Sequence, residues 1–321
     1  MNLKKCATLL SFASLALFAC AGVVQAKTAL SIATGGVAGA YFPIGGAIAQ
    51  AASKGGDLQA TAETGNASVA NLNLLGKGEI EIAFAQNDTA FWAYNGQHMF
   101  KTPLKNLRAI AVLFPEHIQV VASKDAKITD VASMKGKRVG VGAPGSGTEA
   151  DARAMIESGN LTYQDMKVDY LDFAATASRF KDNQIDVGFI VAGYPTAAIM
   201  DLATSRDITL VSFSDAYLAD LAKKYPYFVP NTIPANTYRG IDKDTKTPAV
   251  MAMLLTHDKM KDEVIYSFLK NMFGNIDAVH ASHNAAKQIT LQNALKGVTA
   301  PLHPGAIKFY KEKGLTVPDI K

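Results

Sequence analysis

The sequence predicts an α/β fold of two lobes joined by a hinge, each lobe a mostly parallel sheet flanked by helices. Short apolar or alternating runs typical of strands alternate with segments of helical composition along most of the chain. This alternation favours parallel strands with right-handed crossovers, whose loops gather at one edge of the sheet. The chain has 321 residues, 49% hydrophobic and 19% charged. That composition is ordinary for a globular protein, and the length allows two cores.

An export signal is predicted in residues 1–26. Lys4 and Lys5 precede an apolar run, 7–19, which is shorter than the roughly 20 residues that a membrane span needs. The segment ends at Ala26 in the small-x-small pattern of a signal-peptidase site. We therefore expect export and cleavage after Ala26.

Both cysteines, Cys6 and Cys20, lie inside this leader, so the mature chain would contain no disulfide. Lipidation at Cys20 is the alternative, because residues 17–20 resemble a lipoprotein cleavage box, although Phe18 is bulky for its position. The formal net charge is +4, and loss of two leader lysines leaves +2. This charge gives no global basic field for nucleic acid or a membrane surface.

Three strand-loop-helix units open the first lobe. They are strand 29–33 with loop 34–41, strand 58–63 with loop 64–68, and strand 79–85 with loop 86–89. Glycine in the first loop permits the backbone angles of a sharp turn. Two further strands, 107–113 and 118–123, are expected on either side of Phe114-Pro115-Glu116-His117. We predict that this connection is one crossing between the lobes.

The second lobe repeats the pattern. Its predicted strands are 137–143, 168–171 and 185–191, and loops 144–148 and 192–195 lead into helices. A proline-spaced segment, 226–234, can hardly be helical, so we expect the second crossing at Phe228–Ile233. A strand at 249–255 and helices near 263–273, 285–295 and 304–312 complete the chain. We therefore assign 27–115 plus 236–321 to lobe I and 116–235 to lobe II.

The five strand-helix loops share one design. Each offers glycine, hydroxyl or amide groups at a helix start, where unpaired N–H groups and the helix dipole favour an anion. For any single loop, ordinary helix capping is a sufficient explanation. Three loops belong to one lobe and two to the other, so facing lobes would bring them to one cleft. We expect a small polar ligand to bind there.

Motifs for other functions are weak or missing. Gly140 to Gly145 matches a dinucleotide-binding pattern, but Gly140 and Gly142 fall within the expected strand. The sequence contains neither a phosphate-binding loop nor a nucleophile elbow. His280 and His283 are three residues apart, without a clear third metal ligand. We therefore expect no catalytic residues, no metal and no cofactor, and a protein that is not an enzyme.

Several separate motifs resemble the TAXI-type solute-binding proteins of tripartite ATP-independent periplasmic (TRAP) transporters. They are Ile32-Ala33-Thr34-Gly35-Gly36 with Tyr41-Phe42-Pro43, Glu63-Thr64-Gly65-Asn66-Ala67-Ser68-Val69, Ala85-Gln86-Asn87-Asp88, Gly136-Lys137-Arg138-Val139, 141–149 and Gly193-Tyr194-Pro195. The resemblance implies the hinged, two-lobed fold of type II periplasmic binding proteins. It also implies capture of a small carboxylate in the periplasm, L-glutamate or a five-carbon acid such as 2-oxoglutarate, and delivery to an integral-membrane TRAP permease.

By position, the ligand-facing residues that this resemblance implies are Thr34, Gly36, Tyr41, Asn66, Ser68, Gln86, Asp88, Ser146, Thr148 and Gly193. We expect the turn 145–148 to hold one carboxylate through N–H groups and the hydroxyls of Ser146 and Thr148. Tyr41 and the turn 34–36 would close from the opposite lobe.

The sequence departs from the family at Asn236, where many relatives have glycine, and at Tyr238-Arg239-Gly240, where proline often precedes the glycine. Near the cleft, the Arg239 guanidinium could pair with a second carboxylate; the alternative is a solvated surface arginine. We expect a monomer. A ligand sensor for a receptor and a periplasmic enzyme acting on a small acid remain alternative functions.

Overall fold

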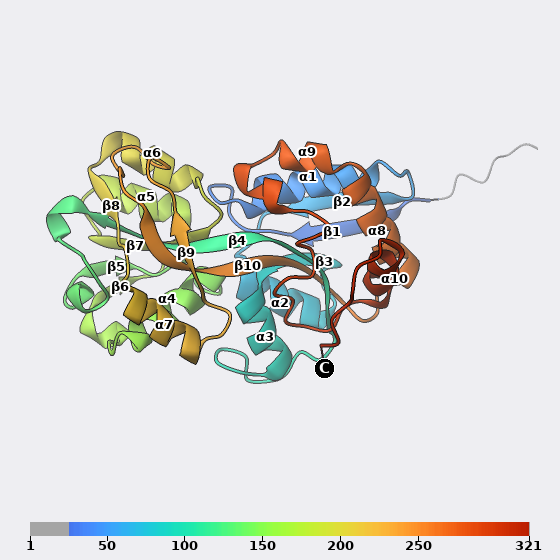
Figure 1. The fold of residues 1–321 in the computed structure, drawn as a ribbon, viewed down its shortest axis with the longest axis horizontal. Helices are drawn as coiled ribbons and strands as arrows, with labels where there is room; N and C mark the ends of the chain where they lie inside the picture. The colour runs from blue at the N-terminus through green and yellow to red at the C-terminus, as the bar shows by residue number, and fades with distance from the viewer. Residues whose placement is uncertain (1–25, 321) are drawn as a thin grey trace, which may run out of the picture.

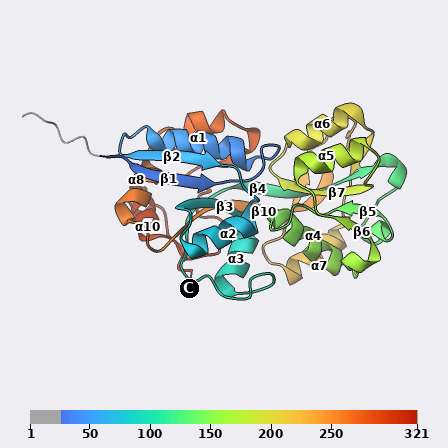
Figure 2. The ribbon, with the colours of Figure 1, turned by 180° about the vertical axis from the view of Figure 1, so that it is seen from behind.

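A computed structural model describes residues 26–320 and shows two lobes side by side (Figures 1 and 2). Apart from Ala26, the predicted export signal and both cysteines lie outside the described residues. The strands are β1 (Thr28–Ala33), β2 (Leu58–Glu63), β3 (Ile82–Gln86), β4 (Leu107–Ser123), β5 (Arg138–Gly140), β6 (Lys167–Asp169), β7 (Val187–Ala192), β8 (Ile208–Leu210), β9 (Val229–Ile233) and β10 (Thr245–His257).

Helices cover both faces of the sheet in each lobe. They are α1 (Tyr41–Ser53), α2 (Ser68–Lys77), α3 (Asn87–Asn95), α4 (Gly147–Ser158), α5 (Phe173–Lys181), α6 (Ala197–Ser205), α7 (Asp215–Lys224), α8 (Asp262–Gly274), α9 (Ile276–His280) and α10 (Pro304–Glu312). In lobe I, α1 lies on one face and α2 and α3 on the other. In lobe II, α5 and α6 lie opposite α4 and α7 (Figures 1 and 2). The α/β fold class predicted from the sequence is confirmed.

One mixed sheet runs through the whole molecule in the order β2-β1-β3-β10-β4-β7-β5-β6. The parallel strands predicted for each lobe are present, as β2-β1-β3 in lobe I and β6-β5-β7 in lobe II. Between these groups, β4 and β10 are antiparallel to each other and to their outer neighbours. The sequence predicted the parallel strands and missed this central antiparallel pair.

Both crossings between the lobes belong to the long strands β4 and β10. The predicted strands 107–113 and 118–123 are a single strand, β4, which pairs with β10 at its start and with β7 from His117 onward. The predicted second crossing at 228–233 is wrong, because this segment forms β9, an edge strand on the beginning of β10. The chain returns to lobe I through β10 itself (Figure 1).

The apolar cores follow the two lobes. One cluster contains the lobe I helices and strands and extends from Leu30 to Tyr310, whereas two smaller clusters fill lobe II. Tyr238 and Ile241 belong to a lobe II cluster, although the sequence assigned 236–321 to lobe I. The lobe boundaries remain a proposal, and this packing favours moving the second boundary into β10.

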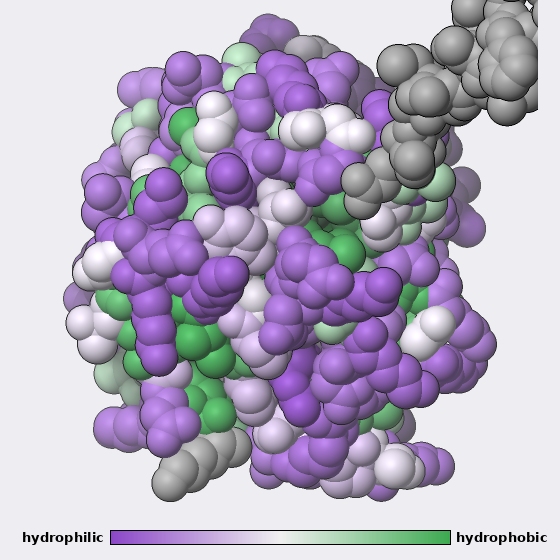
Figure 3. Space-filling view, turned by 90° about the vertical axis from the view of Figure 1, so that its right-hand side faces the viewer, coloured by the Kyte–Doolittle hydropathy of each residue, from purple (hydrophilic) through white to green (hydrophobic). Residues whose placement is uncertain are grey.

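Few large apolar side chains among residues 26–320 are exposed. On the end of lobe I that faces away from lobe II, apolar residues form small areas among hydrophilic ones (Figure 3). Among the described helices, none combines the length and the apolar character needed to cross a membrane.

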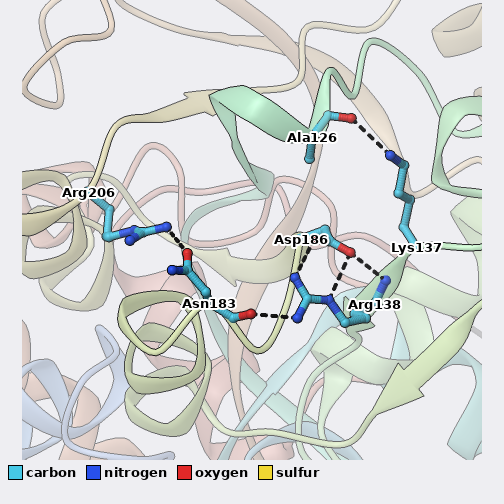
Figure 4. Close-up of polar contacts among 6 residues, drawn as sticks. All are labelled: Ala126, Lys137, Arg138, Asn183, Asp186 and Arg206. Atoms are coloured by element: carbon cyan, nitrogen blue, oxygen red, sulfur yellow. Dashed lines mark hydrogen bonds and ion pairs between the residues drawn. The ribbon is translucent and has the colours of Figure 1, made fainter.

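Charged and polar side chains join several segments at the far edge of lobe II through hydrogen bonds (Figure 4). The Arg138 guanidinium donates to both carboxylate oxygens of Asp186, at 3.1 Å from Nε and 2.6 Å from Nη2. The same arginine and Arg206 both donate to Asn183, at the end of α5. We name Arg138, Asp186, Asn183 and Arg206 the edge cluster. It joins β5 to the turn after α5 and to the end of α6.

Candidate ligand-binding site between the lobes

A cavity of about 160 Å³ lies between the lobes, where the strand-helix loops meet. Lobe I contributes residues 35–41, 65–68 and Gln86; lobe II contributes Ala143, 146–148, 172–174 and 191–192; and Glu116 enters from β4. All five loops singled out in the sequence lie at this end of their strands, as parallel strands require. The cavity is small beside the roughly 300–1,000 Å³ of drug-sized pockets, so it suits a small solute.

The structure brings most of the predicted site residues to this cavity. Its walls include Gly36, Tyr41, Asn66, Ser68, Gln86, Ser146 and Thr148. The other four predicted residues do not line it. Thr34 and Asp88 are fully buried, and a Cβ on Gly193 would lie 2.5 Å from the side chain of Ala285. That packing gives Gly193 a structural reason to be glycine.

Arg239 lies away from the cleft. It lines a shallow groove on the outside of lobe II with Lys124 and residues 203–208, and its guanidinium donates to the carbonyl oxygen of Thr204 at 3.4 Å. The neighbouring Tyr238 is buried instead, and its hydroxyl bonds to Gln119. The idea that Arg239 faces the cleft is wrong, because the chain turns the tyrosine inward and leaves the arginine exposed.

Thr34 has a structural role at the end of β1. Its hydroxyl donates to the carbonyl oxygen of Glu63 at 2.6 Å, so it is already engaged. The Asn71 side-chain amide, on α2, donates to the carbonyl oxygens of Thr34 and Phe84 at 2.8 Å each. Asn71 was not singled out in the sequence, and it fixes the ends of two adjacent strands beneath the site.

The first turns of α2 and α4 meet across the cleft. The N–H group of Ala70 in α2 donates to the carbonyl oxygen of Gly145, just before α4, at 3.0 Å. The backbone of Gly147 lies so close to Gln86 that an added Cβ would fall 1.4 Å from its Oε1 atom. Two positive helix ends therefore face the same cavity, which favours a negative group between them.

The hydroxyls of Ser146 and Thr148, both expected to bind the ligand, differ in whether they already have hydrogen-bond partners. The Ser146 hydroxyl donates to the carbonyl oxygen of Ala143 at 2.7 Å and accepts from the N–H group of Glu149 at 3.1 Å. Ser146 is thus the N-cap of α4, and its hydroxyl is already used both as a donor and as an acceptor. No hydrogen bond from the Thr148 hydroxyl is found within residues 26–320, and this residue lines the cavity. Thr148 is the better candidate donor.

Gln86 connects the lobes beneath the cavity. Its side-chain amide donates to Oδ2 of Asp151 in α4 at 2.9 Å, and its Oε1 atom accepts from the Ser68 hydroxyl at 3.3 Å. Asp151 is completely buried and lies against the carboxyl group of Asp88 from lobe I. Sequence reasoning did not single out Asp151, because its partners Gln86 and Asp88 are far away in the chain.

Asp88, Glu116 and Asp151 form a buried group that we name the carboxyl cluster. Burial raises the pKa of Asp88, and burial together with the Asp88 charge raises the pKa of Asp151 well above its usual range. Among the described residues, neither Asp88 oxygen has a hydrogen-bond donor, and Oδ1 of Asp151 also lacks one. A proton on either aspartate would supply a donor to the other. The two aspartates can therefore share one proton.

Glu116 is the member of this cluster that lines the cavity. It accepts a hydrogen bond from the Tyr41 hydroxyl at 2.6 Å. Burial, with a contribution from the Asp88 charge, raises the pKa of Glu116 to about 8, although the bond from Tyr41 opposes this shift. The sequence contained one signal that we did not use: a single acidic residue inside the apolar run 107–122.

The described residues that line the cavity include no lysine or arginine, and their acidic members are Glu116 and Asp172. Between residues 26 and 320, no group of three histidine, cysteine or acidic side chains is arranged to hold a metal ion. Attraction for an anion must then come from N–H groups, hydroxyls and protonated carboxyls. This arrangement can bind and orient a small polar solute.

Solved structures of other proteins share this fold. A binding protein component of an ABC phosphonate transporter from Pseudomonas aeruginosa aligns with a TM-score of 0.54 and 14% identity, over 83% of this chain and 82% of that one. A protein from Bordetella bronchiseptica aligns with a TM-score of 0.53 and 18% identity, over 92% of this chain and 91% of that one. PhnD1 from Prochlorococcus marinus, solved in complex with methylphosphonate, aligns with a TM-score of 0.51 and 12% identity, over 89% of this chain and 97% of that one. At these identities the likeness concerns the fold alone.

The sequence comparison covers nearly all of the described chain. The NMT1-like family matches residues 32–314, from within β1 to just beyond α10. The matched region therefore includes both lobes, both crossing strands and every residue that lines the cavity. The chain belongs to the NMT1-like family, and it has the two-lobed α/β fold of the type II periplasmic binding proteins.

Proposed function

We propose that this protein is a periplasmic solute-binding protein that captures a small carboxylate between its lobes and delivers it to a membrane permease. The observation that carries the proposal is the meeting of two helix N-termini, α2 and α4, at one small cavity between the lobes. Unpaired N–H groups at such ends bind anions without a cationic side chain. A five-carbon acid, L-glutamate or 2-oxoglutarate, is the proposed ligand.

The proposed partner is a TRAP-type permease. This part rests on the motifs around Thr34, Asn66, Gln86 and Ser146, which resemble the TAXI-type binding proteins. Two of the structural neighbours bear names that refer to phosphonate, one as part of an ABC transporter. A phosphonate and an ABC importer are therefore the rival ligand and partner. The permease genes beside the gene for this chain distinguish the two transporters.

Native mass spectrometry of the exported protein, purified without refolding, tests the ligand. We expect a bound small acid, and titration calorimetry with 2-oxoglutarate, L-glutamate and methylphosphonate then ranks the candidates. Arg239→Ala is the matched control and should bind like the wild type, because Arg239 lies outside the cleft. Loss of binding in that variant, or no binding of any of the three solutes, contradicts the proposed site.

Incubation of the identified acid with the protein, followed by mass analysis of the solute, separates a binding protein from an enzyme. We expect the acid to be recovered unchanged. A ligand sensor would also return it unchanged, so uptake by cells that lack the gene gives the second readout. Loss of uptake supports transport, and normal uptake with a lost transcriptional response supports the sensor.

A further inference from the structure

Glu116 occupies an unusual position for an acidic residue in a pocket proposed to bind an anion. It stands in β4, where this strand passes between the lobes, and its side chain is almost fully buried, with 3% exposed. Ser68, Gln86 and Thr148 line the same cavity. An ionised Glu116 would repel a carboxylate bound beside these residues, because little water separates them.

The groups that face Glu116 from other elements are all neutral or acidic. Tyr41 of α1 donates to its Oε2 atom, Asp88 of α3 and Asp151 of α4 lie behind it, and Asp172 at the start of α5 lines the same cavity. The next residue on β4, His117, packs against the ring of Tyr194 instead. Within the part of the chain that the structure describes, the cavity wall provides no cation to balance an ionised Glu116.

Building on the proposed function, we propose that Glu116 contacts the ligand as a neutral carboxyl group, which donates a hydrogen bond to the ligand's anionic group. The Tyr41 hydroxyl occupies Oε2, so Oε1 carries the proton and donates it. A hydrogen bond from a carboxyl group to a carboxylate is short and strong. Binding of an acid to the ionised form of the protein therefore takes up one proton at Glu116.

This mechanism makes the affinity depend on pH in one direction only. Below about pH 8 Glu116 is already protonated, so the affinity for an acid is constant. Above that pH the proton must be taken from solution, and the affinity falls by about tenfold for each pH unit. An arginine in place of Glu116 would stay charged and attract anions over this whole pH range, so the carboxyl group gives the pocket a pH limit that an arginine would not.

The test compares wild type with Glu116→Gln by titration calorimetry with 2-oxoglutarate from pH 6 to 9.5. The carboxyl groups of this probe remain ionised throughout the range. We expect the wild-type affinity to fall by about 16-fold between pH 8 and 9.5, because half of the Glu116 carboxyl groups are already ionised at pH 8. The glutamine variant keeps an N–H donor without an ionisable proton, so its affinity should stay constant. Glu157→Gln, the same change on the exposed face of α4, should keep the wild-type profile.

Titration at pH 8.5 in buffers with different ionisation enthalpies counts the protons directly. We expect the wild type to take up about 0.8 proton for each acid bound. This measurement needs no substitution, so it decides the matter even if Glu116→Gln fails to fold. Constant wild-type affinity, affinity that falls toward acid, or an unchanged pH profile in a folded Glu116→Gln overturns the inference. Failure of 2-oxoglutarate, L-glutamate and methylphosphonate to bind at any pH is a different result, which overturns the proposed function itself.

Discussion

The edge cluster of lobe II and the carboxyl cluster of the cleft use charge in opposite ways. At the edge, Arg138 and Asp186 have opposite charges and remain partly exposed, so each offsets the other. In the cleft, Asp88, Glu116 and Asp151 would all be negative when ionised, and all three are almost completely buried. The first arrangement stabilises the folded state a little, and the second destabilises it whenever the groups ionise. Such a cost is typical of a functional site.

Gly147→Ala should give the largest effect, because it disturbs the cleft where the two helix ends meet. The added Cβ would overlap the Gln86 side chain and press on Ser68. We expect the affinity for the bound acid to fall by at least about 100-fold, or roughly 2.7 kcal/mol, measured by titration calorimetry. Gly46→Ala is the matched control, since a Cβ there meets nothing within 4 Å. Equal affinities of the two variants for the acid would mean that ligand binding does not require the close contact between Gly147 and Gln86.

Substitutions at the start of α4 should separate ligand binding from helix capping. Thr148→Val removes a hydroxyl that has no partner among the described residues, and we expect a tenfold to hundredfold loss of affinity, because a hydrogen bond to a charged group contributes about 1.5–3 kcal/mol. Ser146→Ala removes the cap, so it should mainly lower the free energy of unfolding by about 1 kcal/mol. Calorimetry and thermal melts give both values. A larger loss of affinity in Ser146→Ala than in Thr148→Val would mean that Ser146, and not Thr148, donates to the ligand.

Asp88→Asn should stabilise the protein at pH 8. Burial raises the pKa of Asp88 in the folded state, so the wild type loses stability as the pH rises from the unfolded pKa of about 3.9 through the folded value. The amide has no such cost and can donate to Asp151. We expect a gain of about 1–2 kcal/mol at pH 8 and little difference at pH 4, seen in thermal melts. Lower stability at pH 8 would show that the Asp88 charge has a partner.

Asp186→Asn, the same substitution in the edge cluster, should have the opposite sign and the smallest effect. The hydrogen bond from Arg138 lowers the pKa of Asp186, so its contribution is present above the unfolded pKa and is lost as the pH falls. Because the pair is partly exposed, we expect a loss of only about 0.5–1 kcal/mol at pH 8. Melts in low and high salt should show a smaller difference in high salt. A stabilising effect would remove the contrast between the two clusters.

The strand-helix alternation predicted most of the fold, and one feature that it missed, the continuous strand β4, was concealed by Pro115. Proline cannot donate to a sheet ladder, so the sequence divided β4 into two strands around it. In the structure, Pro115 pairs with Met251 next to a shift in the β4–β10 register, and the pairing with β7 begins only at His117. The missing N–H group therefore falls where the strand changes partners. A local pattern cannot reveal that the same strand serves two lobes.

The site shows a similar division between local and distant information. Loop composition located the strand-helix loops, because glycine, hydroxyl and amide residues at strand ends are a local signal, and the resemblance then pointed to Tyr41, Ser68, Gln86 and Thr148 within them. The contact between Asp88 and Asp151 joins two lobes and has no local signal. The misplacement of Arg239 has the same origin, since the direction of the turn depends on the burial of Tyr238.

The shared strand β10 also determines the order in which the molecule can assemble. Residues 245–249 pair with β9 and residues 252–255 pair with β3, while most of the strand also pairs with β4. A chain that ends before residue 245 therefore lacks the central strand of its sheet, however many helices it has already made. Folding must wait for contacts between residues that are far apart in the sequence, which slows it.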